Sequence, residues 1–128
     1  MTTALRRALR TDGILSTIAG VALLAAARPV ASFTGIPFGV TVGIGAGSVL
    51  LGGTFLAVSR MDNVRVPGAA VAASNILGTA IAVLAAVTAA PPLTAAGVVS
   101  VLGVGAYTAA IGVAQYRGVR MAQEVGTA

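Results

Sequence analysis

The sequence contains no cysteine and no histidine, and only three of its 128 residues are acidic. The absence of cysteine excludes disulfide bonds, thiolate nucleophiles and cysteine-ligated metals. The absence of histidine removes the commonest general base and metal ligand. No two carboxylates are paired, and no serine lies next to a base, so the usual catalytic roles are unfilled. We therefore expect no enzymatic activity, no cofactor and no bound metal.

Charge of either sign is scarce, at 9% of residues against 57% hydrophobic ones. A soluble domain typically carries about a quarter charged residues, so the excess apolar surface here must face lipid. The net charge of +5 comes from eight arginines, with no lysine, and these lie near the ends of hydrophobic runs. No basic patch is interleaved with aromatic residues, as it is in many nucleic-acid-binding proteins. We expect the lipid bilayer, and not nucleic acid, as a partner.

The uncharged stretch 66–90 is the clearest of four hydrophobic runs. Residues 67–90 would extend about 36 Å as a helix, and a bilayer core is about 30 Å thick. The four runs predict an all-α fold, a four-transmembrane-helix antiparallel bundle that forms a single domain over residues 1–128. We expect the helices at about 12–28, 38–58, 67–90 and 94–116.

The arginines predict the orientation of this bundle. Three lie in the N-terminal head, two in the central loop and two in the C-terminal tail, whereas the two hairpin turns share only Arg28. Short loops rich in arginine stay in the cytoplasm. Both termini and the central loop should therefore be cytoplasmic (N-in/C-in), in a multi-pass protein of the cell membrane.

Asp12 directly precedes the first hydrophobic run, which we expect to end near Arg28 and Pro29. Aspartate at such a place is a good N-cap, because its oxygens accept bonds from unpaired backbone N–H groups at the positive end of the helix. The alternative is a carboxylate that binds a proton or a cation at the membrane edge.

Two runs carry small residues at four-residue spacing, which places each set along one helical stripe. In the run 38–58 these are Gly39, Gly43 and Gly47; in the run 67–90 they are Ala70, Ser74, Gly78, Ala82 and Ala86. Small residues let helix backbones approach closely in lipid. We expect these two helices to make the tightest contact in the fold, and the stripes also favour contact with other chains.

Asn75 is the one strongly polar side chain in the middle of a hydrophobic run, and Thr79 lies one turn further along. An amide in hydrocarbon must find a partner, and such a bond between helices is worth about 0.5–2 kcal/mol. We expect a bond to a hydroxyl of another helix, from Ser16, Thr17, Ser100 or Thr108. The alternative is contact with a solute or water in a small pocket. Gln115 should lie at the cytoplasmic interface beside Tyr116, and Tyr107 should pack or line a cavity.

Three segments carry a resemblance to a family: LRTDGILSTIAGVALLAAA, AASNILG and AQYRGVR. Together they resemble small four-span integral membrane proteins of actinobacteria, along nearly the whole chain. The shared motifs are Asp12 at the start of the first helix, Asn75 in the third and Gln115 near the end of the fourth. The resemblance implies the four-span architecture and supplies no activity.

The small multidrug exporters have similar length and four helices, but they depend on a buried glutamate in the first helix, and residues 14–27 contain no acid. Because we expect all three acids to lie at edges or in loops, a proton-coupled carrier is disfavoured. The sequence therefore predicts a non-enzymatic membrane protein that acts through helix–helix association, as a homo-oligomer or as an accessory subunit of a larger complex. The alternative is a small-solute transporter or channel formed by an oligomer.

Overall fold

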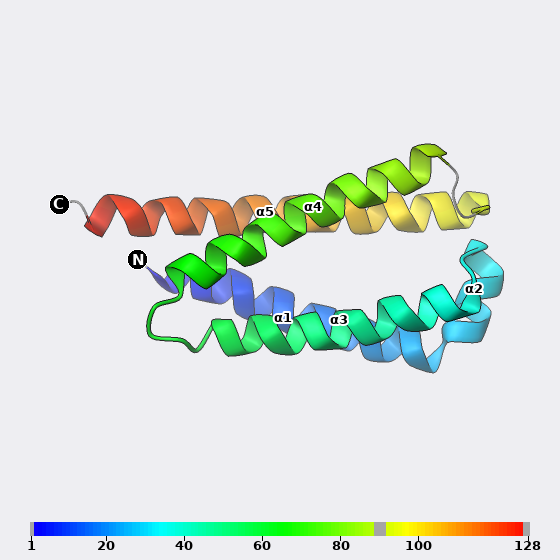
Figure 1. The fold of residues 1–128 in the computed structure, drawn as a ribbon, viewed down its shortest axis with the longest axis horizontal. Helices are drawn as coiled ribbons and strands as arrows, with labels where there is room; N and C mark the ends of the chain where they lie inside the picture. The colour runs from blue at the N-terminus through cyan, green and yellow to red at the C-terminus, as the bar shows by residue number, and fades with distance from the viewer. Residues whose placement is uncertain (1, 89–91, 127–128) are drawn as a thin grey trace.

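The computed structural model describes residues 2–88 and 92–126, and these residues are almost entirely helical. In chain order the helices are α1 (Thr2–Ala25), α2 (Ala27–Thr34), α3 (Phe38–Val58), α4 (Arg65–Thr88) and α5 (Ala95–Gly126) (Figure 1). All but the short α2 are long and apolar enough to cross a membrane. The expected all-α fold with four long apolar helices is thus confirmed, and its composition is that of a multi-pass membrane protein.

The four long helices pack as two hairpins. α1 lies against α3 along most of its length, and α4 lies against α5 in the same way. The starts of α1 and α4 and the ends of α3 and α5 lie at one end of the molecule, whereas α2 and the start of α5 lie at the other (Figure 1). The hairpins meet mainly where α1 packs on α5, and α3 touches α4 only slightly.

Two helices are longer than the sequence predicted. α1 begins at Thr2 and not near residue 12, because the head is rich in Ala, Leu and Arg, which favour helix, and because Leu5 and Leu9 lie one turn apart and are both buried. α5 continues to Gly126, well beyond the expected end at residue 116. Gly118 and Val119 are buried in this extension, so its first part packs against the rest of the chain.

The connector after α1 also differs from the expectation. α1 ends at Ala25, and residues 27–34 form α2, with Pro29 in its first turn. Proline is tolerated there because that N–H has no partner in the helix. Gly35, at φ 77°, ends α2 in the left-handed conformation that glycine adopts most easily. The expected end of the third helix at Ala90, and Pro91 after it, lie outside the described residues.

The tightest helix contact is between α1 and α3, and not between the helices 38–58 and 67–90 as we predicted. A Cβ on Gly13 would lie 2.8 Å from the carbonyl oxygen of Gly52, and one on Gly20 would lie 2.7 Å from that of Gly45. These glycines therefore permit backbone contact across the first hairpin. By contrast, a Cβ on the predicted packing residues Gly39, Gly43, Gly47 and Gly78 would meet nothing within 4 Å.

The glycines of α3 that pack against α1 are Gly45 and Gly52. The predicted stripe lies on another side of the helix and therefore faces away from the rest of the chain. On α4, Ala70 and Ser74 are exposed, and the buried side is the neighbouring one. Within the described residues, these two predicted stripes thus leave most of their small residues outside the intramolecular contact.

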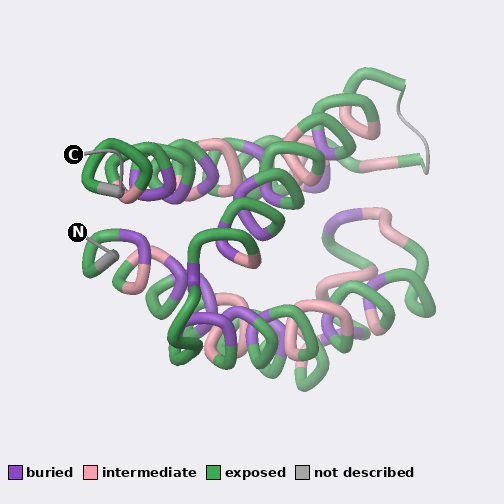
Figure 2. Tube along the Cα trace, turned by 60° about the vertical axis from the view of Figure 1, so that its left-hand side comes forward, coloured by how far each residue is buried: buried purple, intermediate pink, exposed green. Residues whose placement is uncertain are grey.

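The buried apolar core lies toward the end that holds the termini. It consists of Leu5, Leu9, Phe55, Val58, Val64, Val71 and Val119. Figure 2 shows buried residues on the sides of the helices that face one another, and exposed residues over most of the remaining surface. The guanidinium of Arg6 donates to the carbonyl oxygens of Ser59 at 2.8 Å and Asp62 at 3.1 Å, which fixes the loop between α3 and α4 beside α1.

At the opposite end a second contact joins the hairpins. The backbone N–H of Thr94 donates to the carbonyl oxygen of Thr34 at 3.0 Å, and the Thr94 hydroxyl donates to that of Phe33 at 2.7 Å. Gly97 lies so close to the Thr34 carbonyl that a side chain there would clash with it. The two hairpins are therefore tied together at both ends.

Candidate functional site

Asp12 lies inside α1, ten residues after its start, with only 1% of its surface exposed. The N-cap role predicted from the sequence is therefore wrong, as is the expectation that no acid lies within a span. The cause is the early start of α1: Leu5, Leu9, Asp12 and Ser16 recur at helical spacing and share one face. The carboxylate takes the position of a core residue and points toward α4 and α5.

Two amides from the second hairpin bind one carboxylate oxygen. Asn75 Nδ2 donates to Asp12 Oδ2 at 2.8 Å, and Gln115 Nε2 donates to the same oxygen at 2.9 Å. Asn75 Nδ2 also donates to Gln115 Oε1 at 2.9 Å, so the two amides fix each other's orientation. Asn75 is 7% exposed and Gln115 is 0% exposed, which places this contact in the interior of the bundle.

Two hydroxyls bind the other oxygen. Tyr107 donates from its phenol to Asp12 Oδ1 at 3.0 Å, and Ser16 donates to the same atom at 3.3 Å, from one turn further along α1. The carboxylate thus accepts four hydrogen bonds, which matches the acceptor capacity of its two oxygens. None of the four partners is charged. We refer to Asp12, Ser16, Asn75, Tyr107 and Gln115 as the Asp12 cluster.

Close packing of α4 on α5 positions the two amides. A Cβ on Gly112 would lie 3.3 Å from the Cβ of Asn75, so a glycine here lets Asn75 approach α5. Gln115 follows three residues later, which puts it on nearly the same face of α5. On α4, the buried residues Gly68, Val71, Ala72, Asn75 and Ala82 form the stripe that faces the other helices.

Thr79 forms a second polar contact one turn from Asn75. Its hydroxyl lies 2.7 Å from that of Thr108, and it also lies within 3.3 Å of the carbonyl oxygen of Gly105. The Thr79 hydroxyl bonds the backbone carbonyl of Asn75 as well, at 3.0 Å. The Thr79–Thr108 pair therefore joins α4 to α5 directly beside the Asp12 cluster.

The structure brings two of the three predicted polar residues, Asn75 and Gln115, into direct contact, and it places Thr79 next to them. The partners of Asn75 are Asp12 and Gln115, and not the hydroxyls of Ser16, Thr17, Ser100 or Thr108 that we expected. Gln115 is fully buried between the helices.

The hydrogen bonds of Asp12 with Asn75, Gln115 and Tyr107 were not predicted from the sequence. For Asp12, the spacing from Leu5 and Leu9 was the available signal. For Tyr107, nothing in the sequence pairs it with a carboxylate 95 positions away. The fold gathers Asp12, Asn75 and Gln115, the three motif residues named in the sequence, into one hydrogen-bonded group.

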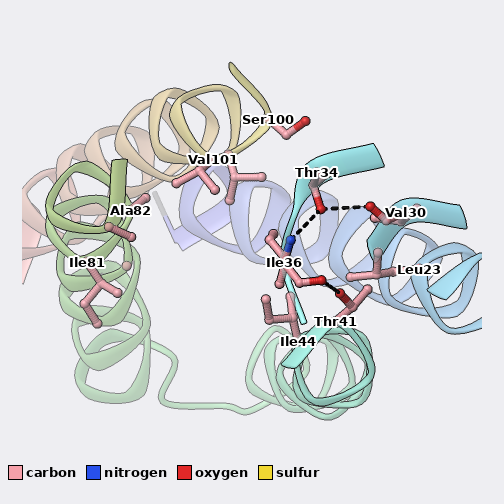
Figure 3. A pocket seen from close by; sticks show the side chains of 13 residues that line it. Leu23, Val30, Thr34, Ile36, Thr41, Ile44, Ile81, Ala82, Ser100 and Val101 are labelled. Carbon is pink, nitrogen blue, oxygen red and sulfur yellow. Dashed lines mark hydrogen bonds between the residues drawn. The ribbon is translucent and has the colours of Figure 1, made fainter. Parts of the chain in front are cut away.

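A cavity of about 340 Å³ lies between the hairpins, in the part where they separate (Figure 3). Its lining is mostly aliphatic, with Leu23, Ile44, Ile81 and Val104 among the residues. The hydroxyls of Thr34, Thr41 and Ser100 also line it, and each donates to a backbone carbonyl of its own or the preceding segment. The cavity therefore offers an apolar surface with few free polar groups.

The cavity and the Asp12 cluster are neighbours along two helices. Gly78 of the lining lies three residues after Asn75 in α4, and Val104 lies three residues before Tyr107 in α5. One helical turn thus separates the cavity from the cluster on both helices. Among the described residues, no three Asp or Glu side chains lie close together.

No family model matches this chain, and no curated protein and no solved structure is similar to it.

Proposed function

We propose that the chain is the subunit of a small membrane transport protein in which Asp12 binds the transported cation. The observation that carries the proposal is the burial of this carboxylate, 1% exposed, within a helix that can cross a membrane. An acid inside a membrane span is costly and by default points to an ion or substrate pathway. Its four partners are uncharged hydrogen-bond donors, so the cluster holds no positive charge to balance an ionised Asp12, and a cation that displaces one of these donors would supply it.

The arrangement of the hairpins supports the same proposal. They are joined at the terminal end by α1 and α5 and at the other end by the contact of Thr94 with Phe33 and Thr34. Between these ends lies the cavity, one turn from the cluster. The hairpins separate at the cavity and are joined at the Asp12 cluster, so binding at Asp12 can change how they meet beside the cavity.

We further propose that this protein lies in the cell membrane with both termini and the 59–64 loop in the cytoplasm. The arginine distribution supports that orientation, and the termini and this loop lie at the same end of the structure (Figure 1). At the other end Phe33 and Phe38 are 68% and 49% exposed, and the Arg28 guanidinium lies 5.3 Å from the centre of the Phe38 ring. Aromatic residues concentrate at such membrane interfaces.

Charge movement in reconstituted vesicles tests the transport proposal. The purified protein, adsorbed in vesicles on a solid-supported membrane, is exposed to steps of sodium, potassium, methylammonium or guanidinium. We expect a saturable current with at least one of these cations, lost in Asp12→Asn and kept in Asp62→Asn, whose acid lies in the exposed loop. Tyr107→Phe, which keeps the ring, should reduce the current. No current above that of empty vesicles, or equal currents from the wild type and Asp12→Asn, would contradict the proposal.

Helix–helix association is the second candidate function, either between copies of this chain or with a larger complex. The open stripe of Gly39, Gly43 and Gly47 on α3 favours it, since such a stripe permits close approach of another helix. Neither candidate is enzymatic. Mass measurement in mild detergent tests association: we expect a particle larger than one chain that reverts to the monomer in Gly43→Leu. A monomeric wild type without a co-purifying protein would argue against it.

A further inference from the structure

The two oxygens of Asp12 face chemically different partners. Oδ2 receives two amide N–H bonds, from Asn75 and Gln115. Oδ1 receives two hydroxyl bonds, from Tyr107 and Ser16. The cluster itself determines the orientations of the two amides. Gln115 accepts a hydrogen bond from Asn75 through its Oε1, so the nitrogen of the same amide faces Asp12.

This difference decides where a proton can be held. An amide NH₂ group only donates, so a proton on Oδ2 would face donors and lose both bonds. A hydroxyl donates or accepts, according to the direction of its hydrogen. A proton on Oδ1 can therefore donate to Tyr107 Oη after the phenolic hydrogen has turned away, and the amide bonds at Oδ2 stay in place.

We propose that Asp12 Oδ1 is a reversible proton-binding site and that Tyr107 is the positioning residue that exchanges donor and acceptor roles with it. A hydronium ion supplies the proton that forms the O–H bond and becomes water, the carboxylate becomes a neutral carboxylic acid, and Tyr107 keeps its own proton throughout. Both protonation states remain hydrogen-bonded, so the cluster can take up and release a proton without being taken apart. Tyr107, at 36% exposure, is the most exposed of the four partners.

No cationic side chain of the described residues forms a hydrogen bond with Asp12 in place of its four uncharged partners. α4 brings the neutral Asn75, and α5 brings Gln115 and Tyr107, of which only the phenol titrates. α3 approaches α1 beside Asp12 through Gly52 and Leu56, neither of which titrates. Arg10 and Arg117, which flank the cluster in sequence, are exposed.

This inference rests on the proposed transport function in one respect: it names the proton as a ligand of the same Asp12 cluster. Its test does not measure transport. The chain contains two aspartates, Asp12 and Asp62, and two tyrosines, Tyr107 and Tyr116. Isotope labels on the aspartate carboxyl carbon and on the tyrosine ring carbon that bears the hydroxyl give four NMR signals in detergent micelles. Asp62→Asn and Tyr116→Phe assign them.

We expect the Asp12 signal to move reversibly between two limiting positions as the pH changes, and the Tyr107 signal to move with the same midpoint. The Tyr116 signal should not follow it. Asp12→Asn resembles the protonated acid, because its NH₂ group can donate to Tyr107 while its oxygen accepts from the amides. In that variant the Tyr107 signal should stay at its low-pH position over the whole pH range in which the wild-type Asp12 signal moves.

Three results would overturn the inference, and the wild-type titration alone can deliver each of them. The Asp12 signal could stay fixed over the whole pH range in which the protein remains folded. It could move while Tyr107 stays fixed, which would exclude the exchange of donor and acceptor. It could respond to added sodium at constant pH and not to pH, which would make the site one for a metal cation. A vesicle experiment without current would leave this titration unaffected.

Discussion

The amide of Gln115 donates a hydrogen bond of 2.9 Å to the carboxylate of Asp12, although 103 positions separate the two residues in the chain. This bond joins α1 of the first hairpin to α5 of the second, between the apolar core at one end of the bundle and the Thr94 contacts at the other. Since Asn75 of α4 binds the same oxygen, one carboxylate holds three helices. The cluster therefore links the relative position of the hairpins to the state of a single acid.

Removal of that acid should destabilise the fold. Asp12→Ala leaves the amides of Asn75 and Gln115 without their common acceptor, and each buried unsatisfied group costs about 1–3 kcal/mol. Asp12→Asn retains an oxygen that accepts from the two amides, so its free energy of unfolding should fall much less. Unfolding by SDS in mixed micelles, followed by circular dichroism, measures both variants. Asp62→Ala in the exposed loop is the control and should match the wild type. Equal stability of the Ala and Asn variants would show that the amides have other acceptors.

The residues of the Asp12 cluster also show which parts of the fold and the site can be predicted from the sequence. Four long uncharged runs predict four long helices, because lipid selects length and apolarity. Asn75 stands out because a polar amide within such an apolar run needs a hydrogen-bond partner. Asp12 does not stand out, because the three arginines before it resemble a polar head outside the membrane. Only the buried Leu5 and Leu9 show that this head is the first part of α1.

The packing of the hairpins was less predictable for a different reason. Glycines and alanines occur on nearly every side of these helices, so several stripes have the spacing for close approach. The structure uses Gly13 with Gly52 and Gly20 with Gly45 and leaves the Gly39–Gly43–Gly47 stripe open. Which stripe is used depends on the tertiary match of two helices, and the pattern within one helix does not contain that information.

Adjacent glycines in α3 allow a direct test of this packing. Gly52→Ala places a methyl group 2.7 Å from both the carbonyl oxygen of Gly13 and the nitrogen of Thr17, so α1 must move away. We expect the free energy of unfolding to fall by about 1–3 kcal/mol, as it does for other overpacked contacts. Gly53→Ala meets nothing within 4 Å and should be neutral or slightly stabilising, by up to about 1 kcal/mol, because alanine favours helix. SDS unfolding compares the two. The same loss in both variants would mean that helix propensity, and not the α1 contact, decides the outcome.

The Thr79–Thr108 pair should contribute a measurable coupling between α4 and α5. Their hydroxyls lie 2.7 Å apart, and hydrogen bonds between membrane helices average about 0.6 kcal/mol, with a maximum near 1.7. A double-mutant cycle of Thr79→Val and Thr108→Val should give a coupling energy in that range. In the control cycle Thr54→Val replaces Thr79→Val, since the exposed Thr54 bonds only its own helix, at Leu50. A coupling of zero in the first cycle would show that the pair adds nothing beyond packing.

The orientation in the membrane can be tested with single cysteines, because the natural chain has none. Asn63 lies in the exposed loop between α3 and α4, and Pro92 is exposed near the start of α5, at the opposite end. In intact cells a membrane-impermeant maleimide should label Pro92→Cys and not Asn63→Cys. Both variants should react after detergent treatment, which controls for buried thiols. Labelling of Asn63→Cys alone would invert the topology, and would mean that the arginine-rich end, with Arg6 holding the loop at Ser59 and Asp62, faces the outside.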